Sequence, residues 1–173
     1  MSVENIRILL IEDDPADADL VCEMFARHPD RRFQLDWVTR VSLGLAHLAS
    51  SPVDLVLLDL NLPDSPGLGT FERLHQHTPH VPIIVVSGIQ DEALAAATIQ
   101  QGAQDYLLKG QVECHALVRS VSNAIERARL QAELRNLSLR DELTGLHNRR
   151  GFRALVEQEL RHSSRDHTSY LLL

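Results

Sequence analysis

The sequence predicts an α/β fold in which a doubly wound parallel sheet of five strands carries helices on both faces. Short apolar runs alternate with longer helical patterns, and this alternation repeats five times. The runs are apolar on both faces, as strands buried between two helical layers are. With 173 residues, 44% of them apolar and 24% charged, the chain can form one full core and a remainder. This composition excludes collagen-like, disordered and disulfide-scaffold proteins.

The expected strands are short segments separated by turn and helix signals. They lie at residues 6–11, 33–38, 54–60, 83–86 and 105–108. The third, DLVLLDL, is continuous in Val and Leu, which is typical of a buried parallel strand. Such sheets bind their ligands beyond the carboxyl ends of the strands.

Helices are expected between these strands and after the last one. They begin at Pro15, cover residues 42–49 and about 70–77, follow Asp91, and resume from Glu113. Asp14 and Asp91 are N-terminal caps, and Gly102 is a suitable residue to end a helix. One face of the first helix is expected to contain Leu20, Val21, Met24 and Phe25.

Charge is distributed unevenly along the chain. Residues 1–125 carry 8 basic and 17 acidic side chains, whereas residues 126–173 carry 9 and 7. The shift predicts two segments of different character, and the acidic first segment argues against nucleic-acid binding. Sixteen of the 17 basic residues are Arg, so we expect a specific role for the single lysine, Lys109.

The sequence also predicts a cellular location. Cys22 and Cys114 are too few and too far apart for a disulfide framework or a zinc ribbon. No run of about 18 apolar residues is present, as a membrane span would require. The first apolar run is followed at once by acidic residues, unlike a secretory signal. We therefore expect a cytoplasmic protein without membrane contact.

Acidic residues follow two of the predicted strands. Glu12, Asp13 and Asp14 follow the first strand, and Asp59 ends the third. If these strands are neighbours, Asp13 and Asp59 share a crevice and raise each other's pKa unless a cation lies between them. Oxygen ligands of this kind suit Mg²⁺. The first three acids could also simply favour a helix N-terminus, but Asp59 is costly in an apolar run without a partner.

Two further strand ends supply groups for an anion. Ser87 follows the fourth strand with a hydroxyl, and Lys109 follows the fifth with an ammonium. A carboxylate surrounded by Mg²⁺, a hydroxyl and a lysine can accept a phosphoryl group, because the cations neutralise charge on its oxygens.

Four motifs at these strand ends carry a family resemblance. LLIEDD, LLDLNLPDSPG, VVSG and DYLLKG, in this order, resemble the receiver domain of two-component response regulators over about residues 5–125. The resemblance implies a flavodoxin-like sheet with strand order 2-1-3-4-5. It also implies phosphorylation by a sensor histidine kinase or a phosphotransfer protein.

The resemblance assigns a role to each site residue. Asp59 would be the phosphoacceptor, and Mg²⁺ would be held by Asp13, Asp59 and the backbone carbonyl of Asn61, with Glu12 helping through water. Ser87 and Lys109 would contact the phosphoryl oxygens, and Tyr106 would change rotamer as Ser87 moves. Two departures are visible: Glu12 replaces a usual Asp, and Gly110 stands where many receivers have Pro.

A phosphatase of the haloacid dehalogenase type is an alternative for the same residues. Such enzymes also use an Asp nucleophile at a strand end, followed two residues later by an acid/base Asp. Position 61 is Asn in this chain. The substitution favours a slowly turning-over switch over a hydrolase.

The helix from Glu113 is unusually long. Its apolar seam comprises Leu117, Val118, Val121, Ile125, Ala128 and Ala132, followed after a phase slip by Leu134 and Leu137. A seam that outlasts its domain usually meets another helix, so we expect a homodimer through this helix. An ordinary terminal helix that frays is the alternative.

The final segment carries a second resemblance. DELTGLHNRR at residues 141–150 resembles the entry of GGDEF domains, the diguanylate cyclases that form cyclic di-GMP from GTP, in which Tyr170 to Leu173 would be the first strand. The catalytic residues of that family would lie beyond Leu173. We therefore expect a receiver domain (1–125), a helical signalling linker (126–140) and a truncated, N-terminal GGDEF fragment (141–173). This chain would not be an enzyme, although its parent would be a cyclase; the alternative is a stand-alone receiver that acts by binding or dimerising.

A weaker candidate site is the histidine cluster of His75, His77 and His80. A metal site there would need carboxylate or Cys ligands and a fixed geometry, which a helix end before Pro79 does not obviously provide.

Overall fold

The computed structural model describes residues 5–28, 33–137, 143–144, 146–147, 149 and 151–153. The chain divides into a first unit, Met1–Ala128, and a second unit, Arg129–Leu173. Most of the GGDEF-like segment, including the strand expected at Tyr170 to Leu173, lies outside the described residues. The three-part division into 1–125, 126–140 and 141–173 stays a prediction.

The first unit is built on one parallel sheet of five strands. These are β1 (Ile6–Ile11), β2 (Phe33–Val38), β3 (Leu55–Leu58), β6 (Ile83–Ser87) and β7 (Asp105–Leu108). Their order in the sheet is β2-β1-β3-β6-β7. Counted along the chain this is the order 2-1-3-4-5, so the predicted fold class is confirmed.

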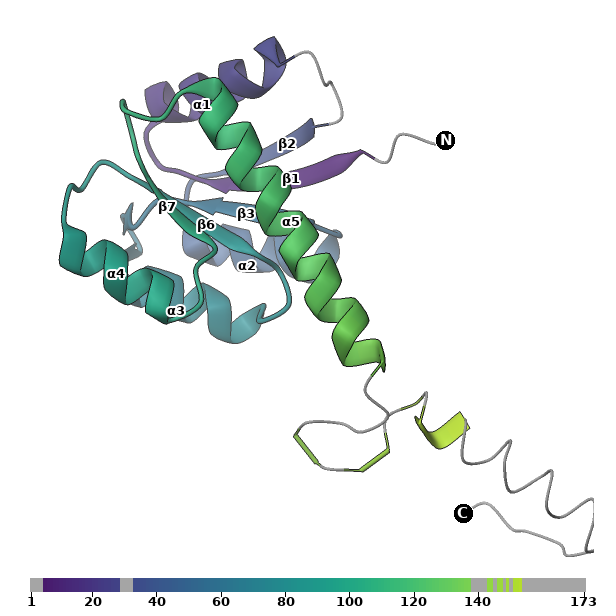
Figure 1. Cartoon of the computed structure of the whole chain (residues 1–173). Coiled ribbons are helices and arrows are strands. Elements are labelled where there is room, and N and C mark those ends of the chain that lie inside the picture. The colour runs from purple at the N-terminus through teal and green to yellow at the C-terminus, as the bar shows by residue number, and fades with distance from the viewer. Residues whose placement is uncertain are drawn as a thin grey trace, which may run out of the picture. The chain divides into compact units, whose positions relative to one another are not determined.

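Helices cover both faces of this sheet (Figure 1). They are α1 (Pro15–Arg27), α2 (Val41–Ser50), α3 (Leu68–His77), α4 (Glu92–Gln100) and α5 (Cys114–Leu137). Buried residues of α1 and α5 form one core cluster with the sheet, whereas α2 and α3 form a second cluster on the opposite face. None of the helices in the described part is long and apolar enough to cross a bilayer.

Alternation along the central strands explains their continuous apolar sequence. In β1, Ile8 and Leu10 belong to the core cluster under α1 and α5, whereas Leu9 and Ile11 belong to the cluster under α2 and α3. Because successive side chains point to opposite faces, a strand covered on both sides needs an apolar residue at every position.

The strand and helix predictions hold with small shifts. Strand β3 is shorter than the predicted 54–60, because its ladder with β1 ends where Ile11 pairs with Leu58. The chain then forms a small antiparallel pair, β4 (Asn61–Leu62) and β5 (Ser65–Pro66), which is not among the predicted strands. Gly102 adopts a left-handed backbone after α4, as a helix-ending glycine should.

Helix α1 shows one confirmed prediction and one wrong one. The Asp14 carboxylate accepts a 2.8 Å hydrogen bond from the Ala16 backbone, and Pro15 opens the helix. Leu20, however, is exposed. The buried stripe of this helix instead contains Ala18, Val21 and Phe25, and Leu20 lies about 100° around the helix from Val21.

The predicted seam of α5 divides into two parts. Leu117, Val118 and Val121 are buried in the first unit's own core, and Ile125 packs against the same cluster. These residues therefore cover their own sheet, and our expectation that they face a partner helix is wrong. Further along the helix, Leu134 of the predicted seam is 67% exposed, and Leu130, which the predicted seam does not include, is also exposed.

Candidate functional site

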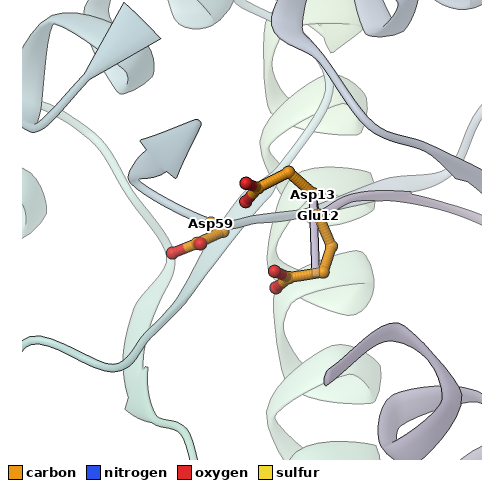
Figure 2. Close-up of side chains that lie close together, drawn as sticks. All are labelled: Glu12, Asp13 and Asp59. Carbon is orange, nitrogen blue, oxygen red and sulfur yellow. The ribbon is translucent and has the colours of Figure 1, made fainter. Parts of the chain in front are cut away.

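Three carboxylates meet at the carboxyl edge of the sheet. Glu12 and Asp13 directly follow β1, and Asp59 directly follows the neighbouring strand β3. The Asp59 N–H donates a 2.9 Å hydrogen bond to the Ile11 carbonyl, which fixes the two strand ends side by side. One carboxylate oxygen from each of the three acids lies within 4.8 Å of the others (Figure 2). Glu12 and Asp59 are buried and Asp13 is exposed.

The single lysine completes this cluster. Lys109 follows β7, and its Nζ lies 2.6 Å from Glu12 Oε2, 2.8 Å from Asp17 Oδ2 and 3.1 Å from Asp59 Oδ2. Burial lowers the pKa of Lys109, but hydrogen bonds to Asp17 and Glu12 and the charge of Asp59 raise it more. The net pKa lies above the ordinary value of 10.5, so the ammonium stays charged at neutral pH.

The pKa of Glu12 shows that holding buried carboxylates close together is unfavourable. Burial raises the pKa of its carboxyl, the hydrogen bond from Lys109 lowers it, and the charge of Asp59 raises it again. The net pKa lies above the ordinary 4.5. The buried carboxylates are therefore held together against their own repulsion by a cation, as expected for like charges at one site.

Ser87 ends β6, and Tyr106 lies within the neighbouring strand β7. Ser87 is buried at the end of β6, and its carbonyl accepts a 2.9 Å hydrogen bond from the Lys109 backbone N–H. Its hydroxyl oxygen accepts a 3.2 Å hydrogen bond from the Ile89 N–H, while the Tyr106 hydroxyl donates a 2.8 Å hydrogen bond to the Ile89 carbonyl. Ser87 and Tyr106 are thus connected through one residue of the loop before α4.

The carboxylate cluster fits a hard divalent cation. Asp59 Oδ1 is buried and accepts no hydrogen bond from any residue in the described part of the chain. Buried carboxylate oxygens normally have partners, so this oxygen keeps a lone pair with which it can bind a cation. The donor set contains only oxygen, which Mg²⁺ prefers. The exposed Asn61 follows two residues after Asp59, at the start of β4.

Sequence reasoning missed Asp17, Trp37 and Asp64. Asp17 lies in the first turn of α1 and pairs with Lys109, but acids at helix N-termini are too common to single one out. The Trp37 indole donates to the Glu12 carbonyl, and both oxygens of the Asp64 carboxylate accept hydrogen bonds at the start of α2. These contacts join distant parts of the sequence and have no local motif.

The histidine cluster does not form a metal site in the structure. The His75 ring stacks on Phe71 with centroids 5.3 Å apart, and His77 Nδ1 lies 2.8 Å from the Arg73 carbonyl. Within the described ranges, Glu12, Asp13 and Asp59 are the group of three or more such side chains close enough to share a metal ion.

Comparisons with known proteins identify the family of this chain. Residues 8–121 match the family described as the response regulator receiver domain. The transcriptional regulatory protein QseB of Haemophilus influenzae is 34% identical over 104 residues, which are 60% of this chain and 46% of QseB. The transcriptional regulatory protein KdpE of Staphylococcus aureus is 35% identical over 108 residues, 60% of this chain and 43% of KdpE. The chain therefore spans less than half the length of these two relatives.

Solved structures show the same likeness. A signal receiver domain from Vibrio parahaemolyticus has a TM-score of 0.66 and 27% identity, covering 75% of this chain and 97% of that one. The receiver domain of an HD domain-containing protein from Pseudomonas fluorescens has a TM-score of 0.64 and 26% identity, covering 73% and 99%. With its sheet order, its carboxylate cluster and a family match over residues 8–121, the chain belongs to the response regulator receiver family.

Proposed function

We propose that this chain is a phosphorylation switch in which Asp59 accepts a phosphoryl group from a sensor histidine kinase or a phosphotransfer protein. The observation that carries the proposal is the environment of Asp59. Its carboxylate is buried among other acids, with Oδ2 beside the Lys109 ammonium and Oδ1 without a hydrogen-bond partner in the described part. A buried carboxylate with an unengaged oxygen next to a cation is arranged as a nucleophile toward an anionic group.

In the proposed reaction, a carboxylate oxygen of Asp59 attacks the phosphorus of a phosphohistidine. An O–P bond forms as the N–P bond breaks, the electron pair stays on the imidazole nitrogen, and Asp59 becomes an acyl phosphate. Asp13, Asp59 and the Asn61 carbonyl would hold Mg²⁺, with Glu12 acting through water. When bound, the metal neutralises charge on the carboxylates and phosphoryl oxygens. Lys109 and Ser87 would contact those oxygens.

The same residues argue against rapid hydrolysis of the phosphorylated Asp59. A phosphatase with an Asp nucleophile needs a second group that exchanges a proton with the leaving or attacking oxygen. The residue two positions after Asp59 is Asn61, whose amide cannot serve as that acid or base. We therefore propose a switch whose phosphorylated state persists long enough to be read.

The proposed output path begins at Ser87. At present the Ser87 hydroxyl accepts a hydrogen bond from the Ile89 N–H. If the hydroxyl turns toward the phosphoryl group, this hydrogen bond must break. The Tyr106 hydroxyl is bonded to the carbonyl of the same residue, so a shift of the loop before α4 changes the position of that ring. A two-state shift of this kind requires only a few kcal/mol of bias.

For the output itself, we propose that the parent protein is a diguanylate cyclase and that two copies associate through the second half of α5. The support is DELTGLHNRR at residues 141–150 and the exposed Leu130 and Leu134 on the helix that leads to it. The matched curated relatives include the transcriptional regulators QseB and KdpE, and the similarity of this chain to each of them covers 60% of its length. The alternative is a stand-alone receiver that acts by binding or dimerising.

Two experiments test these proposals. Incubation with a small phosphodonor and Mg²⁺ should add one phosphoryl group by intact mass, and Asp59→Asn should abolish the addition. Asp54→Asn, at the opposite end of β3, is the matched control and should still be labelled. Unchanged labelling of the Asp59 variant would contradict the assignment.

The output proposal is tested by the gene sequence after the codon for Leu173. An in-frame strand ending in D-x-D, followed by a GGDEF-like loop, supports the cyclase. A stop codon supports the stand-alone receiver, and a DNA-binding module overturns both. The purified chain should form no cyclic di-GMP from GTP.

A further inference from the structure

Asp17 contacts the site from outside the carboxylate cluster. It lies in the first turn of α1, and its Oδ2 is 2.8 Å from Lys109 Nζ. The Asp17 side chain is 38% exposed, whereas that of Lys109 is 16% exposed. Asp17 is not among the three acids whose oxygens converge within 4.8 Å. Asp17 is therefore a partly exposed partner of the ammonium, whereas Glu12 and Asp59 are buried partners.

The other two partners of Lys109 belong to the cluster. Nζ lies 2.6 Å from Glu12 Oε2 and 3.1 Å from Asp59 Oδ2. An ammonium has three protons, and these three carboxylates can each accept one of them. A divalent cation at the cluster would compete with Lys109 for the same negative charge and would repel it. Asp17 lies outside the cluster, so it can still bind the Lys109 ammonium when a cation occupies the cluster.

We propose that Asp17 is a positioning residue that draws the Lys109 ammonium toward α1 and so makes room for Mg²⁺ at Glu12, Asp13 and Asp59. The inference rests on the proposed magnesium-dependent function of this site. With Asp17 neutralised, Lys109 keeps only its two cluster partners and binds them more strongly. Mg²⁺ must then displace a better-held cation, so its affinity falls.

A purely structural role for Asp17 predicts something different. An acidic residue in the first turn of a helix is stabilised by the helix dipole, and its loss weakens the helix. In that case Asp17→Asn would lower the melting temperature and leave Mg²⁺ affinity unchanged. The two roles therefore separate in a binding measurement.

The test is isothermal titration calorimetry of the metal-free chain with MgCl₂. Asp17→Asn should raise the Mg²⁺ dissociation constant by about fivefold or more, within the range of coupling seen between contacting residues. Asp19→Asn, which removes an exposed carboxylate from the same helix, should change it by less than about twofold. Asp17→Glu keeps a charge within reach of Lys109 and should restore most of the affinity.

A second background tests whether Asp17 acts through the lysine. In Lys109→Met, the competing cation is absent, so adding Asp17→Asn should change the dissociation constant by less than about twofold. An equal loss in both backgrounds would overturn the positioning role, as would an Asp17→Asn variant that binds like the Asp19 control. If the unmodified chain bound no Mg²⁺, the proposed metal site itself would fail, and the inference with it.

Discussion

The Trp37 indole Nε1 donates a 2.8 Å hydrogen bond to the backbone carbonyl of Glu12. Trp37 is the only tryptophan of the chain and lies on β2, the edge strand beside β1. Glu12 follows β1 and belongs to the carboxylate cluster. The bond therefore connects the one strong fluorophore of the protein directly to the backbone of the proposed metal site.

This connection predicts a fluorescence signal for metal binding. Adding Mg²⁺ should change Trp37 emission in a saturable way, and the melting temperature should rise as RT ln(1 + [L]/Kd). Both metal-dependent changes should shrink in Asp13→Ala and persist in Asp19→Ala. Because removing a repelling charge can itself stabilise the metal-free protein, the quantity to compare is the difference with and without Mg²⁺. A wild-type protein with no metal-dependent shift would contradict the site.

Asp64 predicts an acid-sensitive contribution to stability. Helix α2 has no capping side chain of its own, and the Asp64 carboxylate accepts hydrogen bonds of 3.1 and 3.0 Å from the Val41 and Ser42 N–H groups. Burial raises the pKa of Asp64, but these backbone bonds lower it more, and the net pKa lies below 3.8. A carboxyl group whose pKa is lower in the folded than in the unfolded state stabilises the fold at pH values above its unfolded pKa. This stabilisation is lost as the pH falls through the folded pKa.

The measurement is urea unfolding of the wild type and Asp64→Ala across a range of pH. At pH 7 the variant should be less stable by about 1 kcal/mol, the usual cost of removing a helix cap. The difference should disappear as pH falls below 3.8 toward the folded pKa. Asp19→Ala, which removes an exposed carboxylate of α1, is the control and should change the stability at pH 7 by no more than about 0.5 kcal/mol. A gap that persisted at pH 2 would count against the capping role.

Gly110, the residue after Lys109, has a backbone conformation in which a substitution should destabilise the fold. Its φ is +76°, in the left-handed region, where proline with its fixed φ near −65° cannot fit. Gly110→Ala should destabilise the fold by about 1 kcal/mol, because an L side chain strains this conformation although there is open space for a Cβ. Gly69→Ala is the control, since Gly69 lies in α3 with open space around it and should gain stability. Chemical denaturation measures both, and equal effects would refute the prediction.

The exposed leucines of α5 predict where the chain associates. Leu134→Glu should weaken self-association by placing a charge on the apolar face while leaving Asp59 labelling intact. Leu43→Glu removes a similarly exposed leucine from α2 and should not change association. Light scattering at tens of micromolar, on the order of the concentrations where weak interfaces pair, measures the difference. A monomer with and without phosphorylation would contradict dimerisation through this helix.

Much of the fold could be predicted because its signals are local. Strands β1, β2 and β7 lie where the sequence places them, since each is a short apolar or alternating run with turn residues at its ends. The Asp14 and Asp91 caps are also local, because each accepts from backbone N–H groups two or three residues away. The prediction that the first part of the α5 seam faces a partner helix is wrong, because periodicity shows that a face is apolar but not which surface covers it.

The sequence by itself determined the order of strands and helices and the acids and lysine at the strand ends, because apolar periodicity and capping act between near neighbours. Only the tertiary structure decided which charges meet. Asp17 and Lys109 are 92 residues apart in the chain, Trp37 and Glu12 are 25 apart, and Asp64 and Val41 are 23 apart. Each contact depends on strand order, register and helix placement, which bring side chains together through space with no corresponding local pattern.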